Sequence, residues 1–194
     1  MLAKTTLHGR TIRLEPLAAR HLPGLALAIK DGALCELPVT LVPRPHELDK
    51  FLENADQQYS TGFGLSFATI EQTSGTVVGS TRFRATEIAH RRAEIGFTFI
   101  AQSWQRTAVN TEAKYLMLKH AFEQWQFNRV EFLTDYLNAQ SRAAIARLGA
   151  TQEGILRSHM VMRDGRIRDS VLFSIISADW PEIKSKLEAM LNAA

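Results

Sequence analysis

The sequence contains a single cysteine, Cys35, among its 194 residues. One cysteine cannot form an intramolecular disulfide, and it excludes a cysteine-rich metal site. The six histidines are scattered, with neither an HExxH motif nor another spacing typical of metal ligands. The composition therefore predicts a protein without a disulfide framework and without a metal cofactor.

Long hydrophobic runs are also missing. No segment approaches the ~20 apolar residues that cross a bilayer. Residues 1–16 lack the apolar core of a signal peptide, and the chain shows no internal repeat and no low-complexity linker. We therefore expect a cytoplasmic protein that does not enter the membrane and that forms a single domain over residues 1–194.

The charge balance is only mildly basic. The formal net charge is +3, and no basic tail or run of basic residues accompanies it. This bias suits a small anionic ligand but is too weak to indicate direct nucleic-acid binding. Hydrophobic residues make up 45% and charged residues 22% of the chain, which is ordinary for a globular protein.

The pattern of apolar residues and turn residues predicts a mixed α/β fold with one central sheet. Strands are expected at 11–17, 65–72, 76–86, 91–100 and 129–135, and a hairpin of 151–162 and 166–176 around Asp164-Gly165. Helices are expected at 18–30, 46–59, 109–126, 138–149 and 178–191, the first of them broken near Pro23 and Gly24. The strand, helix and strand between residues 91 and 135 permit a parallel pair with a right-handed crossover. Gly96, in the middle of one strand, indicates a bulge or a close backbone approach.

The segment SWQRTAVNTEAKYLML, residues 103–118, passes from polar and basic residues into a helix. The first turn of a helix has unpaired N–H groups and a positive dipole end, and both favour an anion such as phosphate. The alternative is an ordinary helix start capped by Asn110 or Thr111. Physical chemistry alone leaves both interpretations open.

Several segments resemble the GNAT superfamily of N-acetyltransferases, and within it the RimJ/RimL-like enzymes that acetylate protein N-termini. They are GRTIRLEPL, VVGSTRF, EIGFTFIAQSWQRTAVNTEAK, RVEFLTDYLNAQSRAAIARLGATQEGILR and DGRIRD, spread over nearly the whole chain. The resemblance implies a mostly antiparallel sheet with a splayed parallel strand pair and helices on both faces. It also implies transfer of an acetyl group from acetyl-CoA to an amine, and it leaves a homodimer open.

The resemblance assigns residues to the cofactor. In the family, a loop of the form Q/R-x-x-G-x-G/A binds the pyrophosphate of acetyl-CoA through backbone amides. The matching positions are Gln105, Arg106, Thr107, Ala108, Val109 and Asn110. Ala108 replaces the first glycine and Asn110 the last small residue. Backbone amides donate whatever the side chain, so a working site is expected, but one with weakened phosphate binding, because alanine tolerates positive φ poorly. Arg106 is expected either to contact the phosphates or to be an ordinary surface arginine. By position, the pantetheine arm would pair with the backbone of Thr98, Phe99 and Ile100.

The resemblance also suggests residues for the chemistry around the thioester. Asn138 matches an asparagine that contacts the cofactor, and Ser141 matches a serine proposed as the partner of the departing thiolate. The alternative for Asn138 is a helix N-cap with no other role. Some relatives carry a tyrosine acid seven residues after the asparagine, but Ile145 stands at that position.

A base must help to deprotonate the attacking amine. Glu94 lies on the strand that approaches the thioester, and His159 lies on a later strand and titrates in a useful range. For both residues the alternative is a structural polar side chain. Glu112 is expected to be a first-turn helix charge rather than a base.

The acceptor remains open at this stage. A protein N-terminus is one candidate, and a small-molecule amine such as a polyamine or an antibiotic is another. If the protein is not an enzyme, the alternative is a non-catalytic CoA-binding module, which the altered loop at residues 105–110 supports.

Overall fold

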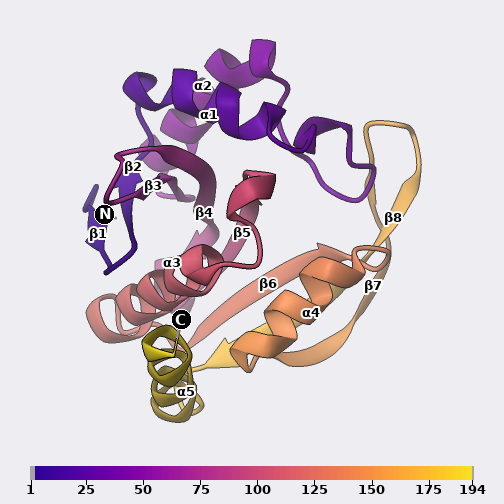
Figure 1. Cartoon of the computed structure of the whole chain (residues 1–194). Helices are drawn as coiled ribbons and strands as arrows, with labels where there is room; N and C mark the ends of the chain where they lie inside the picture. The colour runs from indigo at the N-terminus through magenta and orange to yellow at the C-terminus, as the bar shows by residue number, and fades with distance from the viewer. Residues whose placement is uncertain (1–2, 194) are drawn as a thin grey trace.

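The computed structural model describes residues 3–193 and shows one eight-stranded sheet (Figure 1). The strands are β1 (Leu7–His8), β2 (Ile12–Pro16), β3 (Leu65–Glu71), β4 (Val77–Glu87), β5 (Arg92–Ile100), β6 (Arg129–Asp135), β7 (Thr151–Val161) and β8 (Ile167–Ile176). Their order across the sheet is β1-β2-β3-β4-β5-β6-β8-β7. Neighbouring strands are antiparallel except β5 and β6, which run parallel. The predicted mixed fold with one parallel pair is confirmed.

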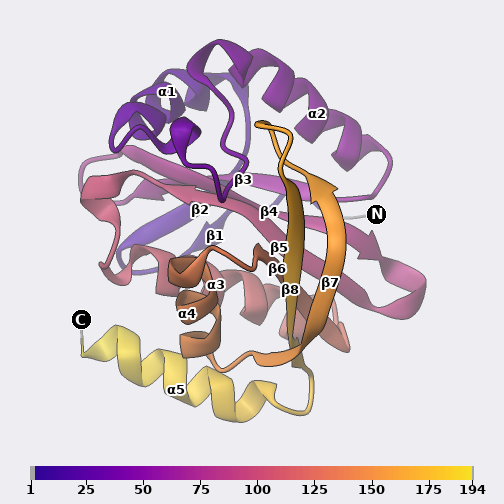
Figure 2. The ribbon, with the colours of Figure 1, turned by 90° about the vertical axis from the view of Figure 1, so that its right-hand side faces the viewer.

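Helices cover both faces of this sheet (Figures 1 and 2). They are α1 (Leu22–Lys30), α2 (Leu48–Ser60), α3 (Ala108–Lys119), α4 (Ala139–Leu148) and α5 (Trp180–Asn192). One hydrophobic core lies between the sheet and α3, α4 and α5, and a second lies between the sheet and α1 and α2. Along β3, Leu65 and Phe67 enter the first core while Ala68 and Ile70 enter the second. This alternation is what the two-residue period of a strand requires.

The element boundaries correct the sequence prediction in two places. Pro23 lies in the first turn of α1, where proline is tolerated, so it begins the helix rather than breaking it. The long helix begins at Ala108 and ends at Lys119, after which His120–Gln124 form a π-helical turn. The predicted C-terminal cap of the next helix is confirmed, because Gly149 adopts a φ of 105° directly after α4.

Glu112 on α3 ties the helix to the start of the sheet. Its carboxylate accepts backbone N–H groups from Arg10 at 2.6 Å and from Thr11 and Ile12 at 2.9 Å each. The side chain is buried. A Cβ at Gly9 would approach this carboxylate to 2.6 Å, so a glycine is needed beside it. With its oxygens engaged by backbone donors, Glu112 is a structural link rather than a base.

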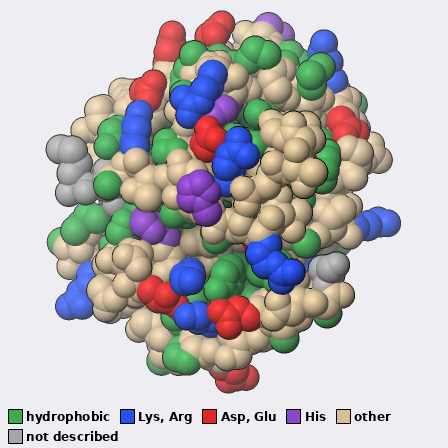
Figure 3. All heavy atoms as spheres, turned by 60° about the vertical axis from the view of Figure 1, so that its left-hand side comes forward, with side chains coloured by type: hydrophobic (Ala, Val, Ile, Leu, Met, Phe, Trp, Pro, Cys, Tyr) green, Lys and Arg blue, Asp and Glu red, His purple; other side chains and the backbone are tan. Residues whose placement is uncertain are grey.

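Among residues 3–193, no helix combines the length and the apolar character needed to cross a membrane. The same part of the chain contains no group of three or more His, Cys, Asp or Glu side chains that could hold a metal ion. On the face shown in Figure 3, basic and acidic side chains lie intermingled.

Candidate active site

The parallel strands β5 and β6 separate soon after they begin. They pair only from Arg92 to Glu94 on β5 and from Arg129 to Glu131 on β6, although both strands continue. Beyond Glu94 they line opposite sides of a cavity of about 710 Å³. The start of α3, the helix α4, the segment 37–42 and parts of β7 and β8 complete its walls. The six residue-to-residue steps from Glu94 to Ile100 span about 20 Å of strand.

A bulge bends β5 at Phe97, within the stretch of the strand that lines the cavity. Register with β4 shifts between the pairs Arg82–Gly96 and Ser80–Phe99, which leaves an extra residue on β5. The chain accommodates the extra residue at Phe97, which adopts a φ of 48°. A bulge leaves backbone groups unpaired and turns the strand, so it helps to direct β5 away from β6. The bulge predicted from Gly96 is therefore present, although the residue with positive φ is its neighbour Phe97.

The loop at residues 105–110 closes one end of the cavity. Gln105 Nε2 donates to the Ile100 carbonyl at 2.9 Å. Arg106 adopts a φ of 61°, and Thr107 caps α3 by accepting the Val109 N–H at 3.3 Å and donating to the Trp104 carbonyl at 2.7 Å. The N-cap is thus Thr107, and the expectation of Asn110 or Thr111 was wrong.

Ala108 is the first residue of α3 and is not among the residues with positive φ. The conformational reason for expecting a weakened phosphate grip at Ala108 therefore does not apply, because the left-handed residue is Arg106. The side chain of Val109 is fully buried in the core, so only its backbone can face a ligand. Asn110, one turn into the helix, lines the cavity.

Arginines surround this helix start. Arg106 and Arg147 line both the main cavity and an adjoining hollow of about 660 Å³, which Arg10 also lines. Arg147 Nη2 donates to Thr111 Oγ1 at 2.8 Å, which holds its guanidinium beside the first turns of α3. Helix N–H groups and guanidinium groups placed together in this way favour an anion such as phosphate.

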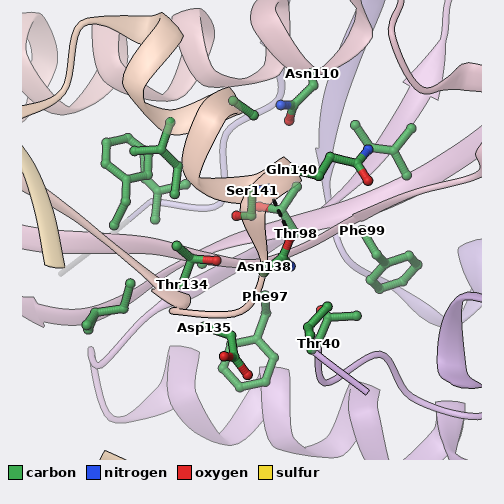
Figure 4. Close-up of a pocket in the computed structure, with 18 of the residues that line it drawn as sticks. Thr40, Phe97, Thr98, Phe99, Asn110, Thr134, Asp135, Asn138, Gln140 and Ser141 are labelled. Carbon is green, nitrogen blue, oxygen red and sulfur yellow. Dashed lines mark hydrogen bonds between the residues drawn. The ribbon is translucent and has the colours of Figure 1, made fainter. Parts of the chain in front are cut away.

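Polar side chains from three elements meet in the middle of the cavity. Figure 4 shows Thr98 on β5, Thr134 on β6, and Asn138 and Ser141 at the start of α4 grouped around the same space. Asn138 is the N-cap of α4, and its Oδ1 accepts the Ser141 N–H at 2.9 Å. Asn138 thus has the structural role foreseen as its alternative and lines the cavity as well.

Lys114 lies beneath Thr98 and is a cavity-lining residue that the sequence analysis missed. Its Nζ donates to Thr98 Oγ1 at 2.5 Å and to Thr81 Oγ1 at 3.1 Å. Burial lowers the pKa of Lys114 to about 7, because a charged ammonium is costly away from water. The sequence did contain an indication that Lys114 lines the cavity: it lies four residues after Asn110 and therefore on the same face of the helix.

The two candidate bases, Glu94 and His159, both line the cavity. Glu94 is buried, and Arg84 Nη1 lies 3.6 Å from its Oε1. Burial raises the pKa of the Glu94 carboxyl, while the nearby Arg84 opposes this change. His159 is more exposed, and its Nδ1 lies 2.9 Å from Ser170 Oγ. Partial burial lowers the pKa of His159, and the positive charges of Arg168 and Arg84 lower it further.

Comparisons with known proteins agree with this geometry. Residues 11–151 match the family described as "Acetyltransferase (GNAT) domain". A solved GCN5-related N-acetyltransferase from Brucella melitensis is 31% identical, with a TM-score of 0.86 over 98% of this chain and 86% of that one. RimJ of Mycobacterium smegmatis, solved in complex with CoA-disulfide, shares the fold at 24% identity and a TM-score of 0.82, over 96% of this chain and 95% of its own.

One curated relative from Bacillus subtilis (strain 168) carries the name "Putative ribosomal N-acetyltransferase YdaF". It is 29% identical over 106 residues, which are 55% of this chain and 57% of that protein. The chain therefore matches little more than half the length of this relative.

Proposed function

Because this chain belongs to the GNAT acetyltransferase family, we propose that it transfers the acetyl group of acetyl-CoA to an amine. One observation carries the proposal. The cavity between the splayed strands β5 and β6 runs without interruption to the arginine-flanked start of α3. A ligand with a phosphate group at one end and an extended arm at the other fits such a space.

The residues present suit acetyl-CoA. Backbone N–H groups of the first turn of α3, apart from the Val109 N–H that Thr107 caps, would hold the pyrophosphate together with Arg106 and Arg147. Beyond Glu94 the edge of β5 that faces β6 has no strand partner, so backbone groups of Thr98, Phe99 and Ile100 are candidates to pair with the pantetheine amides. The Ile100 carbonyl already accepts a hydrogen bond from Gln105, so Ile100 would contribute less to pantetheine binding than Thr98 and Phe99.

When bound, acetyl-CoA would supply a thioester activated for attack by an amine. Glu94 or His159 would accept the amine proton, directly or through a water molecule. The raised pKa of Glu94 makes its carboxylate a stronger base, and the lowered pKa of His159 keeps its imidazole neutral and able to accept a proton. Backbone N–H groups freed by the bulge at Phe97 would stabilise negative charge on the carbonyl oxygen. Ser141 would donate a proton to the departing thiolate.

For the acceptor, we propose a peptide N-terminal amine. The name of the relative YdaF, which describes a ribosomal N-acetyltransferase, supports a protein acceptor. A turnover assay that detects the free thiol of CoA tests the proposal, with N-terminal peptides and polyamines as acceptors. We expect thiol release that depends on a peptide amine and disappears when the peptide N-terminus is blocked. Binding of acetyl-CoA without turnover of any amine would instead support a non-catalytic CoA-binding module.

A further inference from the structure

Arg168, on β8, is a buried cation that points to the chemistry of the acceptor. Only 8% of the residue is exposed, although it lines the cavity. Its Nε donates to Ser170 Oγ at 2.8 Å, and it forms no salt bridge with any residue in the described range 3–193. The nearby carboxylate of Asp135 is occupied by Arg166 at 2.5 Å and by the Leu137 N–H at 2.9 Å.

Arg84 brings a second guanidinium to the same end of the cavity. Its side chain is 30% exposed, and its one acidic neighbour within the described residues is Glu94, at 3.6 Å. Both arginines lie near the His159 ring, whose pKa their charges lower in addition to the larger effect of burial. Arg168 and His159 also share the hydroxyl of Ser170 as a partner. Two guanidinium groups therefore flank the candidate bases. Burial lowers the pKa of the Arg168 guanidinium, and the carboxylates of Asp135 and Glu94, neither within salt-bridge distance of it, offset this only in part.

A guanidinium removed from water without a paired anion is unfavourable by several kcal/mol. A ligand carboxylate would relieve this cost, because the planar fork of arginine matches the two oxygens of a carboxylate. We propose that Arg168, assisted by Arg84, binds a carboxylate that the acceptor carries close to its reactive amine. This inference rests on the proposed acetyl transfer and narrows the substrate class.

The same charges bear on the alternative acceptors. A polyamine brings several ammonium groups, which Arg84 and Arg168 would repel at short range in a partly desolvated cavity. An acceptor with a carboxylate beside its amine neutralises this field instead. Two sources share that chemistry: a peptide N-terminus with an acidic residue at its first or second position, and a free amino acid with its own carboxylate.

Rates with matched acceptors test the inference. The peptide arm compares Ser-Glu-Ala-Ala-amide with Ser-Gln-Ala-Ala-amide, and the small-molecule arm compares glutamate with glutaminamide, its diamide, and with spermidine. We expect kcat/KM to be at least tenfold higher for the carboxylate member of one pair, and the arm in which this occurs identifies the source. Equal rates within each pair, or a preference for spermidine, would overturn the inference while leaving acetyl transfer itself established.

The substitution Arg168→Met then assigns the preference to this side chain. The preference should fall below twofold in Arg168→Met and persist in part in Arg168→Lys. Arg157→Met is the matched control, because Arg157 is exposed on β7, does not line the cavity and carries the same charge. It should keep the full preference. A preference that survives Arg168→Met would show that the carboxylate binds elsewhere.

A binding measurement keeps the inference testable without turnover. N-acetylglutamate, which carries the proposed carboxylates next to an acetylated amine, should raise the Tm of the wild-type protein and of Arg157→Met but not of Arg168→Met. The Tm values of the ligand-free variants, measured on the same preparations, show whether each is folded. Absence of any shift in the wild-type protein would count against the carboxylate subsite, whereas absence of acetyl-CoA binding would count against the proposed function.

Discussion

The substitution Glu112→Gln tests whether one carboxylate fastens α3 to the start of β2. In the structure this carboxylate accepts three backbone N–H groups, from Arg10, Thr11 and Ile12. Glutamine keeps one acceptor oxygen, which can serve Thr11 and Ile12, but its NH₂ group then faces the Arg10 N–H. Hydrogen bonds to a charged group contribute about 1.5–3 kcal/mol each. Losing one of them and the charge on the others should cost about 2–4 kcal/mol.

For a chain of this length, that loss lowers Tm by about 5–15 °C, at 2–4 °C per kcal/mol. Calorimetry of Glu112→Gln beside Glu53→Gln provides the measurement. Glu53 is exposed on α2, so its substitution should change stability by no more than about 0.5 kcal/mol. At a temperature well below both transitions, the Glu112→Gln variant should retain a wild-type kcat. An unchanged Tm would refute the structural link, and an intact Tm with a large loss of kcat would return Glu112 to the list of candidate bases.

Four further substitutions probe the cavity. Because the folded pKa of Lys114 is depressed to about 7, the unfolded chain binds more protons above that pH and stability rises with pH. Lys114→Met should therefore be more stable than the wild-type protein at pH 7. In urea titrations, the difference in unfolding free energy between the two proteins should shrink by up to about 1.4 kcal/mol per pH unit towards pH 10, and a difference that does not change with pH would contradict this. Glu94→Gln should lower kcat by about 10²-fold or more and remove the acidic limb of the pH profile. Because the pKa of Glu94 is raised in the folded protein, the stability that this residue contributes is lost as pH rises. Glu94→Gln should therefore be at least as stable as the wild-type protein at neutral pH. A wild-type kcat in this variant would exclude Glu94 as the base. Ser141→Ala should lower kcat by about 10²-fold or less with little change in KM for acetyl-CoA, and a lower Tm with unchanged kcat would remove Ser141 from the mechanism. Arg106→Gly should raise stability by about 1 kcal/mol by relieving a φ of 61°, yet weaken acetyl-CoA binding in calorimetric titrations; tighter binding would show that Arg106 does not contact the phosphates.

The sheet and its helices could be predicted because their information is local. Apolar residues recur with the period of each element, and Gly149 marks the end of α4 in the chain itself. The family resemblance then supplied the splayed pair and the phosphate loop. The N-cap of α3 was harder, because Thr107, Asn110 and Thr111 are all competent caps. The choice of Thr107 follows from its bond to the Trp104 carbonyl, which needs the turn at Arg106.

The residues that the sequence did not disclose depend on distant contacts. Glu112 becomes a link only when β2, about a hundred positions earlier, lies beside α3. Arg166 and Arg168 are two positions apart and so lie on the same face of an extended chain, but the sequence cannot tell which of them pairs with Asp135. That depends on the register between β6 and β8, in which Asp135 stands opposite Ser170. Within the described residues, Arg166 pairs with the Asp135 carboxylate and Arg168 forms no salt bridge.

The proposed acetyl transfer requires that acetyl-CoA binds in the cavity between β5 and β6. Calorimetric titration of acetyl-CoA into Ala144→Trp and Ala146→Trp tests it most directly. Ala144 lines the cavity, whereas Ala146 is exposed on the same helix and does not line it. If acetyl-CoA lies in this cavity, Ala146→Trp should bind it like the wild-type protein. Ala144→Trp, shown by its Tm to be folded, should bind at least tenfold more weakly, a loss of about 1.4 kcal/mol. Equal affinities in the two variants, or no binding by the wild-type protein, would contradict it.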